Sequence, residues 1–183
     1  MTLTQNLGFK INDARPEDAS GIGQVFYKTW LATYPNEENR ITIDDIEDHY
    51  KQKNSSASIE KRKRHILELP RNTKYLVVKD GEKIIGVCRA VKQENRQQLQ
   101  ALYVLPEYQG KGIGYALWQE AEKFFDATKE IYVQVASYNK HAIDLYKKIG
   151  FKDNGKRFGA EKFKMKSGNV IPEMEMSISP SSL

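Results

Sequence analysis

The stretch Leu99–Gly114 reads LQALYVLPEYQGKGIG and joins two kinds of secondary structure. It contains a continuous apolar run, Leu102–Leu105, which predicts a strand covered on both faces. Pro106 follows directly, and proline ends a strand because it has no N–H to donate to a neighbouring strand. From Ile113 to Phe125 the apolar residues recur at helical spacing. The stretch therefore predicts a strand, a short loop and a helix in direct succession.

Three glycines, Gly110, Gly112 and Gly114, stand where this loop becomes the helix. Glycine tolerates positive φ and allows a ligand to approach the backbone closely. The first amides of a helix have no partner within the helix, and the helix dipole adds about half a positive charge there. Such a loop is suited to bind phosphate, and Lys111 adds a positive charge beside it.

The loop residues also admit other interpretations. A Rossmann dinucleotide site has the pattern G-x-G-x-x-G, but Tyr115 occupies the position of the third glycine. A Walker A loop needs Gly-Lys-Ser/Thr after a four-residue spacer, and this stretch lacks it. A glycine-rich turn that binds no ligand stays open from these residues alone.

A second motif lies further along the chain. The segment Asn139–Phe151 reads NKHAIDLYKKIGF and carries apolar residues at helical spacing. Together with Gln109-x-x-Gly112-x-Gly114, it resembles the two signatures of the GNAT superfamily, the acyl-CoA-dependent N-acetyltransferases. The resemblance extends over almost the whole chain, from Phe9 to Ile178.

This resemblance implies acetyl-CoA as co-substrate. The pantetheine arm would enter where the fourth and fifth strands separate, against Leu102, Tyr103 and Val104. The pyrophosphate would bind the loop and the first helical turn, which consist of Gln109, Gly110, Lys111, Gly112, Ile113, Gly114 and Tyr115. Asn139 would hold the pantetheine arm, although as a helix N-cap it would also have a purely structural use.

The resemblance also implies that a primary amine attacks the thioester directly in a ternary complex. Tyr146 would donate to the departing thiolate, although its place in an apolar stripe also suits a residue of the hydrophobic core. Members of this family often place a carboxylate on the fourth strand to relay the amine proton. The corresponding stretch Gln98–Ala101 has no acid, so the general base stays unassigned.

The acceptor site is expected between the first two helices and the open end of the strands, where Trp30 and Tyr34 would line it or belong to the core. Acidic residues between Glu37 and Asp48 favour a cationic acceptor such as a polyamine, a lysine side chain or an amino sugar. Ordinary first-turn acids on solvated helices would also explain them.

Composition limits the classes of protein that fit. Of 183 residues, 39% are hydrophobic and 10% aromatic, so we expect one domain over residues 1–183 with its core at about 9–178. A net charge of +5 favours a polyanionic ligand, either coenzyme A or nucleic acid. The basic run Lys61–Arg64 would suit phosphate, but on a short helix such a run is more often a solvated face.

Other features of the sequence argue against several classes of protein and of site. The lone Cys88 allows no disulfide framework, and three scattered histidines give no metal-ligand spacing. The first eight residues lack the pattern of a signal peptide, and no apolar run is long enough to cross a bilayer. We therefore expect a cytoplasmic protein without a metal, a membrane role or a nucleic-acid partner.

Periodicity and turn residues predict the other elements. Three helices are expected early in the chain: one that starts within Asp13–Asp18 and is closed by Pro35, one over Ile43–Lys51, and one over Ile59–Leu69 after a polar linker, Asn54–Ser58. Strands are expected at Phe9–Asn12, Tyr75–Lys79, Lys83–Lys92, Leu99–Leu105 and Ile131–Val135, with a last hairpin at Phe163–Lys166 and Val170–Ile178. The order of the expected elements is β-ααα-βββ-α-β-α-ββ. This order fits an α/β (α+β) protein with a mixed, mostly antiparallel sheet of about seven strands and helices on both faces. The GNAT fold, which the two motifs resemble, has this architecture.

Three alternatives stand beside acetyl transfer to a small amine, and one of them is a nucleic-acid binder that uses Lys61–Arg64. The missing strand carboxylate favours a GNAT-like module that binds acyl-CoA without transfer, and the fold also suits a protein lysine or N-terminal acetyltransferase. A homodimer is left open.

Overall fold

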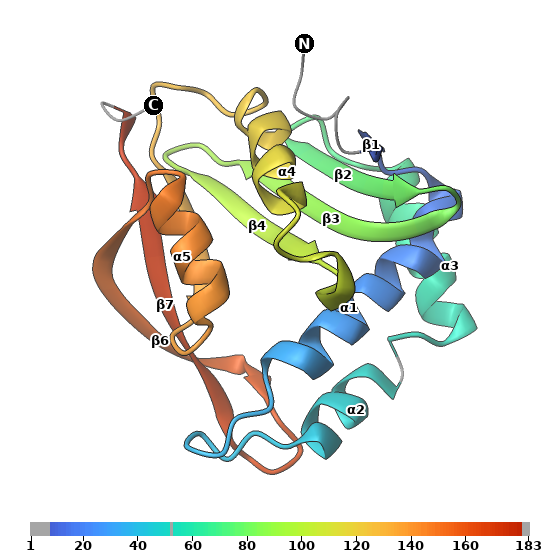
Figure 1. Ribbon diagram of the computed structural model, residues 1–183, viewed down its shortest axis with the longest axis vertical. Coiled ribbons are helices and arrows are strands. Elements are labelled where there is room, and N and C mark those ends of the chain that lie inside the picture. The colour runs from blue at the N-terminus through green and yellow to red at the C-terminus, as the bar shows by residue number, and fades with distance from the viewer. Residues whose placement is uncertain (1–7, 52, 181–183) are drawn as a thin grey trace.

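The computed structural model describes residues 8–51 and 53–180, the side chains of 160–163 excepted, so the ends of the expected domain lie outside the described part. Its helices are α1 (Ala19–Thr33), α2 (Ile43–Lys51), α3 (Ser56–Leu67), α4 (Ile113–Glu122) and α5 (Lys140–Lys148), with short 3-10 helices η2 (Pro16–Asp18) and η3 (Pro106–Tyr108). Its strands are β1 (Lys10–Asp13), β2 (Thr73–Asp80), β3 (Lys83–Lys92), β4 (Gln97–Val104), β5 (Ile131–Ala136), β6 (Lys152–Lys164) and β7 (Val170–Ile178). The predicted order of elements is confirmed (Figure 1).

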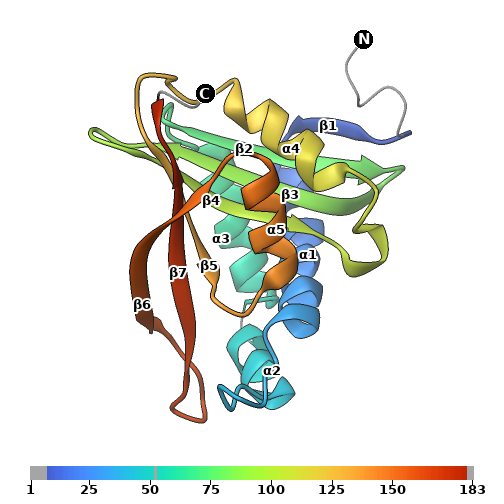
Figure 2. The same ribbon diagram turned by 60° about the vertical axis from the view of Figure 1, so that its left-hand side comes forward.

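The strands form one sheet in the order β1-β2-β3-β4-β5-β7-β6. Every neighbouring pair is antiparallel except β4 and β5, which are parallel. Helices α4 and α5 lie on one face of the sheet, and α1 and α3 lie on the other (Figures 1 and 2). The predicted fold class, a mixed, mostly antiparallel sheet between helices, is therefore confirmed.

The sheet opens between its two parallel strands. Pairing of β4 with β5 is confined to Gln97 with Ile131 and Gln98 with Tyr132, so the strands separate beyond these residues. The side chain of Gln97 is fully buried and fixes the closed end, because it donates to the Asp126 carbonyl and accepts from the Asp126 N–H, both at 2.8 Å. The separation expected between the fourth and fifth strands is present.

Strand β4 is also irregular where the separation begins. Leu99 pairs with Ala90 of β3 and Ala101 pairs with Arg89, which leaves Gln100 as an extra residue on β4. Such a bulge bends a strand and changes the direction in which its side chains point. The bulge therefore contributes to the divergence of β4 from β5.

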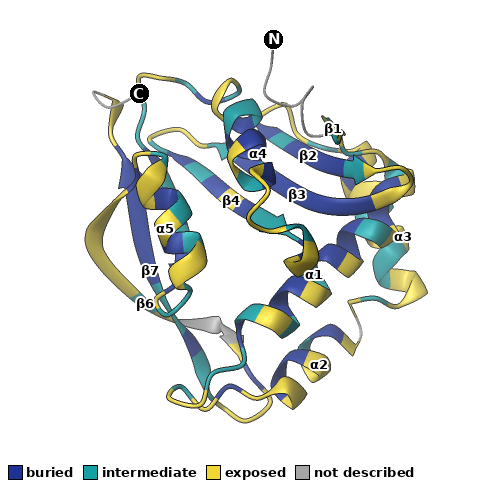
Figure 3. Cartoon of the chain, in the orientation of Figure 1, coloured by how far each residue is buried: buried dark blue, intermediate teal, exposed yellow. Residues whose placement is uncertain are grey.

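The hydrophobic core fills the space between the sheet and the helices (Figure 3). A second, smaller cluster joins α1 and α2 to β7 and contains Trp30, Tyr34, Ile46, Tyr50 and Ile171. Two of the residues predicted to line an acceptor site thus belong to a buried cluster. Among the described residues, no helix is long and apolar enough to cross a membrane.

Helices α4 and α3 differ from the predictions in their boundaries, and α3 ends at Leu67 and not at the predicted Leu69. The apolar spacing predicted a helix up to Phe125, but α4 ends at Glu122, because the N–H groups of Phe124 and Phe125 bond three residues back and tighten the last turn. The linker predicted over Asn54–Ser58 is wrong in its second half. There, Ser55 accepts from the Ser58 N–H at 3.3 Å and caps a helix that begins at Ser56.

Most of strand β6 was not predicted. The sequence indicated a strand only from Phe163, whereas β6 begins at Lys152. The strand lies at the edge of the sheet, its residues from Lys152 to Arg157 are exposed, and its register with β7 shifts twice. An exposed, irregular edge strand shows no alternation of apolar and polar residues, so periodicity could not reveal it.

Asp45 connects the start of α2 to the turn between β6 and β7. Its carboxylate accepts from the Thr42 N–H at 2.9 Å, as in a capping box, and from the Ser167 N–H at 2.8 Å. Burial alone would raise the pKa of Asp45, but these hydrogen bonds outweigh it and lower the pKa below its ordinary value of 3.8.

We expect Asp45→Asn to lower the free energy of unfolding at pH 7 by about 1–2 kcal/mol, since the charged acceptor of both N–H groups is lost. Because the folded pKa of Asp45 lies below the unfolded one, its stabilisation is present above about pH 4 and disappears as the pH falls through the folded value. Urea unfolding at pH 7 and pH 3 measures both effects. Asp44→Asn, an exposed neighbour, is the control; equal stability of both variants and the wild type would contradict the assignment.

Candidate functional site

The glycine loop has the backbone geometry that its composition predicted. Gly110 and Gly112 have φ values of 74° and 81°, and Gly112 is the N-cap of α4. Side chains other than glycine adopt this region of φ only with strain. The Gln109 side chain donates to the Val104 carbonyl at 3.0 Å and ties the loop to the end of β4. The N–H groups of the first α4 turn thus begin at a loop whose shape depends on glycine.

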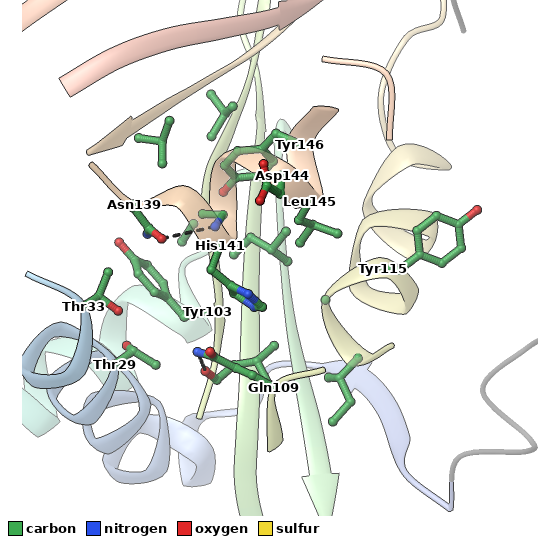
Figure 4. A pocket seen from close by; sticks show the side chains of 18 of the residues that line it. Thr29, Thr33, Tyr103, Gln109, Tyr115, Asn139, His141, Asp144, Leu145 and Tyr146 are labelled. Atoms are coloured by element: carbon green, nitrogen blue, oxygen red, sulfur yellow. Dashed lines mark hydrogen bonds between the residues drawn. The ribbon is translucent and has the colours of Figure 1, made fainter. Parts of the chain in front are cut away.

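A cavity of about 380 Å³ extends from this loop along α5 to the gap between β4 and β5. It brings together Tyr146, which was predicted to act on the leaving thiolate, and most of the residues predicted to bind the cofactor, namely Leu102, Tyr103, Val104, Gln109, Gly110, Gly112, Ile113, Gly114, Tyr115 and Asn139 (Figure 4). Lys111 does not line the cavity, and its ammonium lies 4.8 Å from the centre of the Tyr108 ring. The Tyr115 ring lies on the outer side of α4, away from the other labelled side chains, so any contact predicted there would use its backbone (Figure 4).

Several residues of α5 line the same cavity without having been predicted. His141, Leu145 and Lys148 follow one another at intervals of four and three residues, so they lie on one face of the helix. This spacing was the signal that could have identified them once Asn139 had been placed in the site. Thr29 and Thr33 of α1 also line the cavity, which shows that it reaches through the gap in the sheet.

Asn139 has the structural use that the sequence allowed for its position, and it also lines the cavity. Its side-chain oxygen accepts from the Ala142 N–H at 3.2 Å, so it is the N-cap of α5. The same residue lines the cavity. Capping orients the Asn139 side chain at the start of the helix and leaves the residue in contact with the cavity.

Tyr146 lies in the core and also borders the cavity. Its ring packs at 5.8 Å from the Phe151 ring, on the side of the core. Burial, assisted by the nearby Tyr103 and Cys88, raises the pKa of Tyr146 well above its usual value. The hydroxyl therefore keeps its proton at neutral pH and can act as a hydrogen-bond donor.

A pair of tyrosines stands at the gap between the strands. The hydroxyl groups of Tyr34 and Tyr103 lie 3.2 Å apart, and the Tyr138 hydroxyl donates to the Tyr34 carbonyl at 2.8 Å. Burial raises the pKa values of both Tyr34 and Tyr103. These side chains join the end of α1 to β4 by neutral hydroxyl groups.

A second cavity of about 350 Å³ opens near the same tyrosine pair. It shares four residues with the first cavity, namely Tyr34, Gln100, Tyr103 and Gln134. Trp30 lines only the second cavity, and its indole ring is stacked on His49 at 4.8 Å. The two cavities therefore meet at the gap between β4 and β5, and the two predicted acceptor residues lie in the second one.

The acidic residues between Glu37 and Asp48 do not form a site. Asp45 has the structural use given above, and Glu37, Glu38, Asp44, Glu47 and Asp48 are exposed and line neither cavity. The acid that lines the second cavity is Glu173 of β7, which the sequence analysis missed. Its alternation with apolar residues, Glu173-Met174-Glu175-Met176, was the signal that acids lie on one face of this strand.

The basic run on α3 contributes partly to the packing of the fold. The Arg62 guanidinium donates to the Ala19 carbonyl at 2.8 Å and to the Lys53 carbonyl at 3.2 Å. Lys63 bonds Glu60 at 2.7 Å. The described residues contain no group of three or more His, Cys, Asp or Glu side chains arranged to hold a metal ion.

Comparison with known proteins identifies the family. Residues 28–151 match the family model described as "Acetyltransferase (GNAT) family", which covers more than half of the chain. The chain belongs to this family of acetyltransferases.

Two relatives match shorter segments. Uncharacterized protein YrkN of Bacillus subtilis is 33% identical over 79 residues, which is 42% of this chain and 43% of YrkN. Thialysine N-epsilon-acetyltransferase of Sus scrofa is 36% identical over 78 residues, which is 42% of this chain and 45% of that enzyme. The match thus spans less than half the length of either relative.

Solved structures share the fold over nearly the full length. The PaiA N-acetyltransferase of Thermoplasma acidophilum, crystallised with coenzyme A, has a TM-score of 0.67 at 24% identity and covers 93% of this chain and 98% of its own. A GNAT acetyltransferase of Streptococcus pneumoniae has a TM-score of 0.68 at 21% identity, over 92% of this chain and 98% of its own. At these identities the likeness concerns the fold.

Proposed function

We propose that the protein transfers an acetyl group from acetyl-CoA to a primary amine by direct attack of the amine. The observation that carries the proposal is the meeting of two cavities at the gap between β4 and β5. One cavity begins at a glycine loop suited to phosphate, and the other opens beside it. Two reactants that enter from different sides would meet there, which supplies a large part of catalysis by proximity.

The residues present fit the chemistry of coenzyme A. The backbone from Gln109 to Tyr115 would hold the pyrophosphate, because a glycine loop that opens a helix presents N–H groups and a positive dipole end. Strand β4 is unpaired on its β5 side beyond Gln98, so backbone groups from Leu102 to Val104 would bind the amide-containing arm. The PaiA relative was crystallised with coenzyme A, which supports this assignment.

Acetyl-CoA supplies an acyl carbon that is already activated as a thioester. An enzyme nucleophile is therefore unnecessary, and the lone Cys88 suits that role poorly. It is fully buried, it lines neither cavity, and burial raises the pKa of its thiol to about 12.

Tyr146 is the residue we assign to the leaving group. Its hydroxyl is protonated at neutral pH, and its residue borders the first cavity. A donor held in place before the reaction stabilises charge that develops on sulfur without reorganising at that moment. Asn139, at the start of the same helix, would orient the arm of the cofactor.

The absence of an acid from Gln98–Ala101 of β4 favours one other function, binding of acyl-CoA without transfer. The decisive measurement is release of free CoA thiol from acetyl-CoA in the presence of small diamines, amino sugars, and peptides with lysine or a free N-terminus. We expect turnover with at least one amine. Binding of CoA without turnover on any amine would favour the non-transferring module.

Substitution of Gly112 tests the proposal that the glycine loop binds the pyrophosphate of coenzyme A. We expect Gly112→Glu to weaken CoA binding by about a hundredfold or more, because a carboxylate would face the phosphates at the helix N-terminus. Gly112→Ala is the matched control, since it places the same strain on a φ of 81° without adding charge. Calorimetric titration of CoA, with melting temperatures of both variants, gives the answer. Equal affinities for the two variants would remove the phosphate argument.

Substitution of Tyr146 tests its proposed role as the hydrogen-bond donor to the leaving thiolate. We expect Tyr146→Phe to lower kcat by about 10- to 100-fold while the Kd for CoA changes little, because only the hydroxyl is removed from a packed ring. Steady-state kinetics and CoA titration separate the two effects. A loss of CoA affinity as large as the loss of kcat would instead indicate a packing role.

A further inference from the structure

The bulge in β4 places one side chain at the point where the two cavities meet. Gln100 is the extra residue of the bulge, and it lines both cavities. Leu99 and Ala101, on either side of it, are buried and pair with β3, whereas Gln100 is exposed. Because a bulge changes the direction of a side chain, this irregularity accounts for an amide at the gap between β4 and β5.

The side-chain amide of Gln100 has no hydrogen-bond partner among the described residues. Two other glutamines near the site are engaged by the backbone. Gln97 holds the Asp126 backbone with both ends of its amide, and Gln109 donates to the Val104 carbonyl at 3.0 Å. An amide offers an oxygen that accepts a hydrogen bond and an NH₂ group that donates. Gln100 therefore has both ends available to a ligand at the meeting point of the cavities.

The other residues that line both cavities are Tyr34, Tyr103 and Gln134. The two tyrosine hydroxyl groups lie 3.2 Å apart, and burial raises the pKa values of both. The amides of Gln100 and Gln134 do not titrate. None of these four residues therefore takes up a proton near neutral pH.

Ionisable side chains border each cavity away from this meeting point. The second cavity alone is lined by Glu173 of β7 and Tyr132 of β5, and the first alone by His141, Asp144, Tyr146 and Lys148 of α5 and by Tyr108 and Tyr115 near the glycine loop. On β3, Arg89 pairs with Ala101 and its guanidinium bonds His65 of α3 at 2.8 Å. An amine whose nitrogen lies where the cavities meet is thus in contact with groups that do not titrate.

A free amide suits one task in the transfer. The neutral nitrogen of a primary amine attacks with its lone pair and carries two N–H groups. A hydrogen-bond donor beside it would occupy the lone pair, whereas an amide oxygen binds an N–H and leaves the lone pair for the acyl carbon. A C–N bond then forms and the C–S bond breaks, and the nitrogen loses one proton while the sulfur gains one. From the neutral amine, the transfer therefore needs no net removal of a proton.

We propose that Gln100 orients the attacking amine by accepting one of its N–H groups, and that the enzyme takes its acceptor in the neutral form. The proposal rests on the acetyl transfer proposed above. An alkyl amine has a pKa of about 10.4, so its neutral fraction rises tenfold for each pH unit below that value. The kcat/KM for the amine should rise with the same slope. This role also explains how β4 can serve the transfer without an acid in Gln98–Ala101.

Two substitutions of Gln100 test the proposal. Methionine has about the same length and no amide, so we expect Gln100→Met to lower kcat/KM for the amine by about 10- to 100-fold while the Kd for CoA changes less than about twofold. Gln100→Glu keeps an acceptor oxygen at the same position and adds a base. We expect this variant to stay active and its pH profile to become flat above the carboxylate pKa of about 4.3, because the bound ammonium then loses its proton to the enzyme. A residue with only a structural role would leave the slope unchanged.

The acceptor is putrescine, glucosamine or a lysine peptide, whichever the wild type acetylates fastest, and the profile is measured below the pKa of that amine. Gln98→Glu is the matched control, because Gln98 lies on the same strand and lines only the second cavity; its profile should keep the slope of the wild type. Melting temperatures and CoA titration show whether each variant is folded.

Three results would overturn the proposal: a flat profile in the wild type, which would show that an enzyme base takes the proton; full activity of Gln100→Met; or a slope in Gln100→Glu equal to that of the wild type or of Gln98→Glu. If the wild type acetylated none of these amines, the proposed function would fail and the role of Gln100 would fail with it. Turnover by the wild type combined with any of the three results overturns the role of Gln100 alone.

Discussion

The site depends on how far two parallel strands remain hydrogen-bonded. Strands β4 and β5 pair only at Gln97 and Gln98, and beyond these residues each strand has a free edge inside the molecule. A buried strand edge normally carries unsatisfied N–H and C=O groups, which are costly unless a ligand or water satisfies them. Two cavities meet at this opening, and helices of both faces contribute residues to them. The fold and the site thus result from the same interruption of the sheet.

Local signals predicted the parts of the fold that are locally determined. The continuous apolar run of β4 and the glycines before α4 each specify a conformation within a few residues. The structure also places most of the predicted cofactor residues around one cavity. The predictions failed where contacts with another segment determine the secondary structure. The exposed edge strand β6 is an example, because hydrogen bonds to β7 stabilise it and its sequence shows no periodicity.

The second cavity shows that residues of the candidate site, too, could not be predicted where contacts between distant segments decide their position. The acidic stretch Glu37–Asp48 was prominent in the sequence, yet its exposed members line neither cavity. Glu173 was inconspicuous among the lysines and glutamates of the C-terminal hairpin. It reaches the cavity because β7 is inserted between β5 and β6, a pairing between distant segments. Charge along the chain therefore drew attention to acids that lie outside both cavities.

The buried Gln97 has a consequence for how the opening behaves. Its side-chain amide holds the Asp126 backbone from both sides, and its own N–H bonds the Glu130 carbonyl at 2.8 Å. These hydrogen bonds anchor the end at which β4 and β5 are paired, so the opening between the two strands begins at a fixed position in the fold. A ligand that binds between β4 and β5 therefore enters an opening that already exists in the folded protein. Its binding costs little conformational entropy of the chain.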